Sequence, residues 1–405
     1  MAKRYRAGDV AKSIKNDRKK LILSIYLPTL MVQIGMRMTV TFMPLYAMEL
    51  GAGIVMTGFI VTAKNLGAMV FNLPAGFIIG RWKASHLMMI GLSGIMIAAF
   101  LRGLSPTPIL LLFASFMVGA FKTLWDLTRL TYIRNNVPIK IRGRVLSGLG
   151  GLFRLSRIIG PLAGGFIISF FGFRPIFFLS SFLTLLADFM ILFLLPPGRK
   201  VETLSQSESL IFLKDHLLKN KKNITVAAIG IIGLSLLRVS RDFILPIWAD
   251  HIGMTVAALG LATSISAVIE LTLFFPAGWI MDNLGRKWAL IPAISLMTIA
   301  FSFLPLTTGF PGFLAIAIII SLGNGLGSGI NMTIGTDLAP EEAPGHFLGL
   351  WRFFSDGSMA AGPLIIGLIS SSFSLGVSPY AISGLGITTT VILLKYMDKM
   401  KHKEH

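Results

Sequence analysis

Long apolar runs separated by short polar segments fill the chain between residues 22 and 396. A transmembrane helix needs about 20 predominantly apolar residues, and each run is close to that length. Backbone groups in hydrocarbon must hydrogen-bond internally, and no alternating barrel pattern is present, so we predict that every run is a helix. The twelve predicted spans cover residues 22–47, 54–79, 86–104, 108–133, 145–171, 175–196, 224–249, 255–281, 288–307, 311–338, 346–372 and 376–396.

Matching residues recur at an offset of 202 positions, which indicates an internal repeat. Two parallel halves of this kind are typical of one large class of transporters, with the substrate site at the interface between them. We therefore predict two pseudo-symmetric six-helix bundles, 22–196 and 224–396, joined by a cytoplasmic linker at 197–223 and flanked by cytoplasmic tails at 1–21 and 397–405. The matches are Pro44 with Pro246, Gly51 with Gly253, Gly58 with Gly260, Pro138 with Pro340, Gly143 with Gly345, and Gly160-Pro161 with Gly362-Pro363.

Composition supports an all-α membrane protein, because 54% of the 405 residues are hydrophobic and only 14% are charged. A net charge of +19 would also fit a nucleic-acid-binding protein. The basic residues, however, concentrate in the tails and in every second loop, which is the positive-inside pattern of membrane proteins. Only Arg102 and Arg174 fall in the opposite set of loops. We predict a multi-pass plasma-membrane protein with both termini in the cytoplasm and no nucleic-acid partner.

The sequence offers no sign of an enzyme, and we predict neither a cofactor nor a metal site. The absence of cysteine excludes disulfides and thiolate-bound metals. The six histidines show no metal-ligand spacing, and no nucleophilic triad is visible.

A short loop motif gives the first indication of a family. The stretch "GWIMDNLGRK" (278–287) resembles the loop motif G-x-x-x-D-R-x-G-R-R of the major facilitator superfamily, although Asn283 replaces the usual arginine. The stretches "RGRVLSG" with "GPLAGG" (142–165) and "GHFLGLWRFFSDGSMAAGPLIIG" (345–367) support the resemblance, which covers nearly the whole chain. It implies a monomeric secondary transporter that works by alternating access. It also implies that the fifth span neighbours the eighth and that the second neighbours the eleventh.

The same resemblance implies that the loop motif acts as a conformational latch. An aspartate is stabilised at a helix N-terminus by the partial positive charge and the unpaired N–H groups there. We expect Asp282 to reach the start of the fifth span, or Arg142 or Arg144, when the carrier faces outward. The predicted motif residues are Gly278, Asp282, Gly285, Arg286 and Lys287, with Gly76 and Arg81 in the first copy.

The first copy of the motif has lost its acid, because Gly80 stands where the second copy has Asp282. One hypothesis is a latch of reversed sign, in which Arg81 and Lys83 face Glu341 and Glu342 at the start of the eleventh span. The alternative is that Gly80 marks a decayed motif.

Fourteen charged residues fall inside the predicted spans and away from their ends; Asp337 is left out, because it sits at the inner edge of the tenth span, within reach of water. On insertion scales each costs roughly 2.5–3.5 kcal/mol at the centre of a lipid-facing helix, so we expect most of them to face a wet cavity or one another. Spacing by one helical turn predicts local pairs of Lys122 with Asp126, Arg238 with Asp242, and Arg352 with Asp356. The fourteen are Arg37, Lys64, Lys122, Arg129, Arg154, Arg157, Arg238, Arg241, Arg352, Asp126, Asp188, Asp242, Glu270 and Asp356.

Contacts between the halves are predicted from depth. Glu270 in the eighth span and Arg157 in the fifth lie at a similar distance from the inner ends of their helices, at 1.5 Å rise per residue. Lys64 in the second span and Asp356 in the eleventh are similarly related, with depths that match less well. Glu270 is the candidate proton-titrating residue, because a buried pair across a moving interface can be released by protonation. A permanent structural ion pair is the alternative. The predicted proton-coupling or gating residues are Glu270, Arg157, Arg154, Lys64, Asp356 and Arg352.

The charges inside the spans also favour an anionic substrate. Arg37 and Arg238 lie at nearly the same depth in the first and seventh spans, where two arginines can bind a carboxylate or phosphate with forked hydrogen bonds. The predicted substrate-binding residues are Arg37, Arg238, Arg241, Lys122 and Asp126.

Other functions remain open at this point. Efflux of an amphipathic drug competes with transport of an organic anion, although the arginine typical of drug antiporters is absent, since Ser115 precedes Gly119 by four residues. A receptor, membrane enzyme or lipid scramblase with the same fold is a further alternative. The partners that we predict are a small-molecule substrate, protons and the lipid bilayer.

Overall fold

The structure is a computed structural model that describes residues 22–79, 82–195, 217–218, 220–340 and 344–397. These residues form helices and the turns between them, with no strand. Eleven of the helical segments in the described residues are long and apolar enough to cross a membrane. The first span adds a more polar helix of 23 residues, which is also long enough. The predicted all-α fold of twelve transmembrane helices is therefore confirmed, while the tails and most of the linker lie outside the described residues.

The first bundle packs α2 against α6 and α7, and α4 against α5 and α7, while α3 lies on α5. The helices follow the predicted spans closely. Their bounds are η1 Ile22–Tyr26, α2 Leu27–Glu49, α3 Ile54–Ile79, α4 Ala84–Leu104, α5 Pro108–Asn136, α6 Ile139–Phe171 and α7 Arg174–Leu194.

The second bundle repeats this packing with helices related by the 202-residue offset. Here α9 packs against α15 and α16, α12 against α13 and α16, and α10 against α13. Breaks divide three of the spans into two helical pieces. The bounds are α9 Lys221–His251, α10 Val256–Thr272, α11 Phe274–Asn283, α12 Lys287–Phe303, η2 Leu304–Leu306, α13 Phe310–Leu326, α14 Ile330–Leu338, α15 Pro344–Ser372 and α16 Val377–Tyr396.

The repeated glycines Gly51 and Gly253 end the first helix of each bundle in the same way. Both have a positive φ, 84° and 72°, which favours glycine because it has no Cβ. Past each glycine the chain folds back, so that the Ala52 and Met254 N–H groups donate to carbonyls five residues earlier, 3.0 and 2.9 Å away. The matching glycines thus fix the same turn twice.

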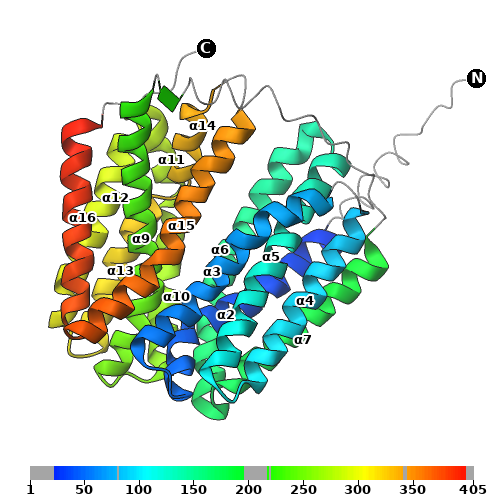
Figure 1. The fold of residues 1–405 in the computed structure, drawn as a ribbon, viewed down its shortest axis with the longest axis horizontal. Helices are drawn as coiled ribbons and strands as arrows, with labels where there is room; N and C mark the ends of the chain where they lie inside the picture. The colour runs from blue at the N-terminus through cyan, green and yellow to red at the C-terminus, as the bar shows by residue number, and fades with distance from the viewer. Residues whose placement is uncertain (1–21, 80–81, 196–216, 219, 341–343, 398–405) are drawn as a thin grey trace, which may run out of the picture.

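The two bundles touch along α3 with α15, α6 with α10, and α2 with α9. Figure 1 shows that they diverge toward the end where α2 begins and α16 ends, which we call the open end. The opposite end, which carries the turns at residues 50–53 and 252–255, we call the closed end. The expected neighbours, the fifth span with the eighth and the second with the eleventh, are both observed.

Repeated glycines and prolines make the contacts at the closed end. A Cβ on Gly58 would lie 2.7 Å from the carbonyl oxygen of Pro363, and a Cβ on Gly260 would lie 2.5 Å from that of Pro161. Only a residue without a side chain permits backbones to approach this closely. The two contacts are related by the internal repeat, so each half supplies one glycine and one proline to the interface.

Hydrogen bonds related by the same repeat join the halves nearby. The Thr62 hydroxyl donates to the Ala360 carbonyl and the Ser264 hydroxyl to the Ile158 carbonyl, each over 2.8 Å. Proline disturbs the helical hydrogen bonds of the preceding turn, and these acceptors lie three residues before Pro363 and Pro161. The prolines therefore leave these backbone carbonyl groups available to accept hydrogen bonds from hydroxyl groups on the opposite half.

Removing both hydroxyls, with Thr62→Val and Ser264→Ala, should weaken the closed end. Hydrogen bonds between transmembrane helices contribute on average about 0.6 kcal/mol each, so the pair should shift the balance toward opening by about 1 kcal/mol, or roughly fivefold. Distances between spin labels across the closed end would measure the shift. Thr388→Val is the matched control, because the Thr388 hydroxyl bonds only within its own helix. An unchanged distance distribution in the double variant would contradict a role for these bonds.

Candidate functional site

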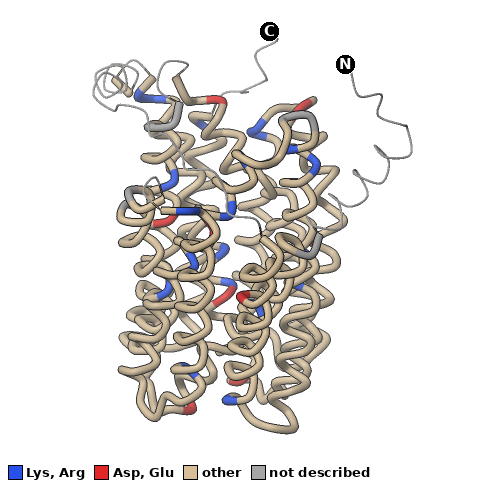
Figure 2. Tube along the Cα trace, turned by 90° about the vertical axis from the view of Figure 1, so that its right-hand side faces the viewer, with Lys and Arg blue, Asp and Glu red and all other residues tan. Residues whose placement is uncertain are grey.

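Three adjoining cavities lie between the bundles, at the depth where Figure 2 shows charged positions within the helical region. The central cavity has a volume of about 390 Å³, and its walls include Arg37, Lys64, Arg238 and Glu270. The inner cavity, of about 250 Å³, extends toward the open end past Asp126. A smaller interface pocket, of about 70 Å³, lies on the side of the closed end. Arg37 borders all three, and the central cavity is large enough for a small molecule.

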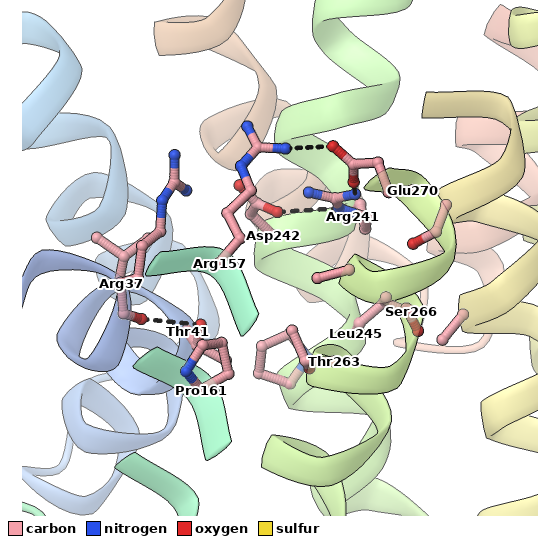
Figure 3. Close-up of a pocket in the computed structure, with 15 residues that line it drawn as sticks. Arg37, Thr41, Arg157, Pro161, Arg241, Asp242, Leu245, Thr263, Ser266 and Glu270 are labelled. Carbon is pink, nitrogen blue, oxygen red and sulfur yellow. Dashed lines mark hydrogen bonds and ion pairs between the residues drawn. The ribbon is translucent and has the colours of Figure 1, made fainter. Parts of the chain in front are cut away.

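An ion-pair network crosses from one bundle to the other beside the central cavity (Figure 3). Arg157 Nη1 on α6 lies 2.5 Å from Glu270 Oε1 on α10, and Arg241 Nη1 on α9 lies 3.1 Å from Glu270 Oε2. Arg241 Nε also lies 3.1 Å from Asp242 Oδ1. The contact expected from helix depth, Arg157 with Glu270, is therefore present. Arg241 adds a second cation that depth alone did not identify as a partner of Glu270.

Two predicted arginine roles differ from the observed contacts. Arg154 does not reach Glu270, because its guanidinium lies over the ring of Phe274, 3.5 Å from the centroid. The prediction that Arg238 pairs with Asp242 is wrong. Its Nε donates to the Asn324 side chain over 2.6 Å, and its Nη2 donates to the Gly327 carbonyl over 2.7 Å.

The break between α13 and α14 explains the position of Arg238. Gly329 has a φ of 78°, and the interrupted helix leaves carbonyl groups without their usual partners. The arginine satisfies one of these oxygens with a side chain already held by Asn324. Asn324, a polar residue within "GNGLGSG", was the signal in the sequence that could have indicated this contact.

The predicted local pairs occur in the inner cavity. Lys122 pairs with Asp126, and Arg129 Nη2 lies 3.0 Å from the other oxygen of Asp126, a contact that spacing did not predict. Arg352 lies 3.4 Å from Asp356. The acidic side chains of this cavity are therefore already neutralised by cations from their own helices.

Lys64 does not pair with Asp356, although both border the inner cavity. Among the described residues Lys64 makes neither an ion pair nor a side-chain hydrogen bond, and the same is true of Arg37. The expectation of a Lys64–Asp356 gate is not supported in this conformation. Lys64 instead extends the basic wall of the central cavity.

Arg102 occupies a different place from the one expected. The charge pattern places it in an outer loop, but it lies in the last turn of α4, with only 3% of its surface exposed, and it borders the central cavity. Its Nε is buried without a hydrogen-bond partner in the described structure. A cation just inside the end of a predicted span was the signal that could have indicated this position.

The loop motif lies at the open end, outside the cavities. Gly285 has a φ of 101°, so a glycine is favoured there, whereas Gly76 and Gly278 have open space around them. Lys287 donates to the Leu394 carbonyl over 3.2 Å. Arg81, like Gly80, Glu341 and Glu342, lies outside the described residues, so the first-copy latch stays a prediction.

The second-copy latch is not formed in this conformation. Asp282 is 66% exposed and lies 3.5 Å from Arg286 on its own loop, while Arg142 donates to carbonyls of its own bundle at Arg134 and Val137. The latch was predicted for the opposite conformation, in which this end is closed. The contact of Asp282 with the start of the fifth span therefore stays a prediction.

Arg286 instead has a structural partner that the sequence did not identify. Its side chain is 1% exposed, and its Nε lies 2.8 Å from Asp337 Oδ2 on α14. The sequence places Asp337 at the edge of a span within reach of water, yet its side chain is only 22% exposed. The pair connects the loop after α11 to α14, the part of the broken span α13–α14 that lies nearer the open end.

Asp337→Asn should destabilise the fold, because it removes the nearer and more buried of the two carboxylates that face the buried guanidinium of Arg286. Breaking one side of a buried pair costs roughly 3 kcal/mol or more, and the partial exposure of Asp337 lowers the expected loss to about 2 kcal/mol. Thermal unfolding in detergent, followed by tryptophan fluorescence, would measure it. Asp282→Asn is the control and should unfold close to the wild-type temperature. Equal unfolding temperatures for Asp337→Asn and wild type would show that the pair is not stabilising.

Comparison with known proteins agrees with the two-bundle architecture and the cavity between the halves. The family model described as "Major Facilitator Superfamily" matches residues 25–240 and 227–405. An uncharacterized MFS-type transporter of Methanocaldococcus jannaschii is 22% identical over 88% of this chain and 91% of its own. Multidrug resistance protein 2 of Bacillus subtilis is 24% identical over 68% of this chain and 70% of its own.

A solved structure has the same fold. The inward-facing, unoccupied form of a bacterial homologue of the human lysosomal transporter Spinster covers 93% of this chain and 95% of its own. It superposes with a TM-score of 0.75 at 12% identity.

Fold, cavity and family together define a multi-pass membrane transporter rather than an enzyme. The chain belongs to the Major Facilitator Superfamily.

Proposed function

We propose that the protein moves a small organic anion across the plasma membrane by alternating access, coupled to protons through Glu270. The excess of positive charge in the central cavity is the observation that supports an anionic substrate. Six basic side chains and two acidic ones line it in the described structure, and both acids already pair with arginines. A solute that brings negative charge would neutralise the remaining cations, whereas a cationic solute would add to their repulsion.

Both termini are proposed to lie in the cytoplasm, as the basic loops indicate. The open end is then the cytoplasmic one, and the described conformation faces inward. The contacts at Gly58 and Gly260 would separate when the carrier turns outward, and the Asp282 latch would form at the other end. Each conformation would thus be held by contacts at the end that is closed.

Proton coupling is supported by the position of Glu270. This carboxylate joins α6 of one bundle to α9 and α10 of the other. Protonation would remove its negative charge, weaken both ion pairs and release Arg157 from the opposite half. The strength of the ion pair between the two bundles would then depend on whether Glu270 carries a proton.

Efflux of an amphipathic drug is the second candidate. The name of the Bacillus subtilis relative favours it. The predominance of basic groups in the cavity argues against the cationic drugs, and an anionic drug would be compatible with the same site.

Substrate uptake by proteoliposomes tests the proposal. A panel of carboxylates, phosphate esters and amphipathic dyes would be offered with and without a pH gradient. We expect one anion class to accumulate, and the gradient to increase its accumulation. Accumulation of cationic dyes alone would overturn the anion assignment, and accumulation that is insensitive to pH would overturn proton coupling.

A further inference from the structure

Three basic side chains on three different helices border the central cavity without a protein partner. They are Arg37 on α2, Lys64 on α3 and Arg102 on α4, all in the first bundle. Among the described residues, the side chains of the three make neither an ion pair nor a hydrogen bond, and Arg102 Nε is fully buried. Arg102 is buried, and Arg37 and Lys64 are half-buried. Most cations that are withdrawn from water in proteins are paired, so three unpaired cations in one cavity require a physical reason.

The other charges of the molecule do not supply that reason. Glu270 and Asp242, the acids of the central cavity, are bound by Arg157 and Arg241. Farther toward the open end, Asp126 and Asp356 are held by cations on their own helices. In Figure 3 the guanidinium of Arg37 lies to one side of the Glu270 network, and no marked contact reaches it.

We propose that Arg37, Lys64 and Arg102 form a binding site for an oxyanion substrate that carries at least two negative charges, such as a dicarboxylate or a phosphate ester. This inference rests on the proposed function and specifies its substrate class. Two arginines can present forked donors to carboxylate or phosphate oxygens, while the lysine acts as a compact point charge. A singly charged anion would leave at least two of the three cations uncompensated, so a doubly charged one should bind better.

The position of Arg102 indicates the end of the molecule from which an anion would first reach the site. It lies two residues before the end of α4 on the side of the closed end, and the Tyr46 hydroxyl donates to its carbonyl over 3.0 Å. Its backbone is therefore anchored near the turns that separate when the closed end opens. Arg102 would be the first of the three cations that an anion meets from that side, with Arg37 and Lys64 deeper in the cavity.

Binding of defined probes to the purified protein tests the site. Thermal stabilisation would be titrated with succinate, glycerol 3-phosphate, inorganic phosphate and acetate at constant ionic strength. We expect succinate or glycerol 3-phosphate to bind at least about tenfold more tightly than acetate, and Arg102→Gln to weaken that binding by about tenfold or more. Comparing succinate with glycerol 3-phosphate distinguishes the dicarboxylate from the phosphate ester.

Arg134→Gln is the matched control. Arg134 is an exposed arginine in the last turn of α5 and does not border the central cavity. Arg102→Lys should restore part of the affinity, and Lys64→Gln provides an independent test should Arg102→Gln fail to fold.

The outcomes separate this inference from the proposed function. Unchanged probe affinity in both Arg102→Gln and Lys64→Gln would overturn the three-residue site while leaving anion transport standing. Equal affinity of the wild type for acetate and for the doubly charged probes would overturn the assignment of two charges. If the wild type binds none of the anions and accumulates only cationic dyes, the proposed function fails together with the site.

Discussion

Glu270→Gln is expected to abolish pH-driven accumulation of substrate while downhill exchange stays measurable. The amide keeps the shape of the side chain but cannot take up a proton or carry the charge that holds Arg157 and Arg241. The carrier would therefore resemble the permanently protonated form, able to change conformation but unable to draw work from a proton gradient. Counterflow of labelled substrate, measured beside gradient-driven uptake in the same proteoliposomes, would separate the two activities.

Asp188→Asn is the control for the loss of a carboxylate inside a span. Asp188 accepts a hydrogen bond of 2.6 Å from the Ser93 hydroxyl within the first bundle and does not border the three cavities described here. It should retain gradient-driven uptake. If Glu270→Gln still accumulates substrate against its gradient with unchanged pH dependence, then Glu270 has a structural role only.

Gly260→Ala is expected to prevent closure at the closed end and to reduce transport by more than tenfold. The new Cβ would lie 2.5 Å from the Pro161 carbonyl oxygen, closer than real Cβ atoms come to other atoms, and the obstacle is backbone rather than a flexible side chain. Overpacking of this kind typically costs about 1–3 kcal/mol, enough to reverse a balance between two conformations of similar energy. Gly58→Ala should act in the same direction through the related contact with Pro363.

Spin labels across the closed end would report this shift directly. The chain has no cysteine, so Pro106→Cys and Phe373→Cys can be labelled without background. Both positions are exposed near the closed end, one in each half. We expect longer distances in Gly260→Ala than in the wild type. The control is Gly384→Ala on α16, where a Cβ meets open space. Unchanged distances in Gly260→Ala would mean that the glycine contact does not control closure.

The fold could be predicted from the sequence because its two strongest determinants are patterns along the chain. Apolar length fixes the spans, and the 202-residue repeat fixes the division into halves. The repeat also identified matching residues whose structural roles could be seen only in the structure. Gly51 and Gly253 recur because they end equivalent helices, whereas Gly58 and Gly260 recur because they touch the opposite half.

The site could be predicted only in part, because sequence gives the depth of a residue better than it gives the direction of its side chain. Depth, together with the helix neighbours that the family resemblance implied, predicted the contact of Arg157 with Glu270 across the interface. Arg238 and Asp242 are one helical turn apart and were expected to pair, but the break after α13 offers Arg238 better acceptors. Arg102 was missed for a related reason, since its backbone lies near the end of a span while its side chain borders the cavity.

The movement of protons during anion transport tests the central claim most directly. Proteoliposomes that contain the wild-type protein and a trapped pH-sensitive dye would receive succinate or glycerol 3-phosphate, without an imposed gradient. The proposed mechanism predicts a change in lumenal pH with one of these anions and no change with Glu270→Gln. Anion uptake by the wild type with no accompanying pH change, or a pH change triggered only by cationic dyes, would contradict it.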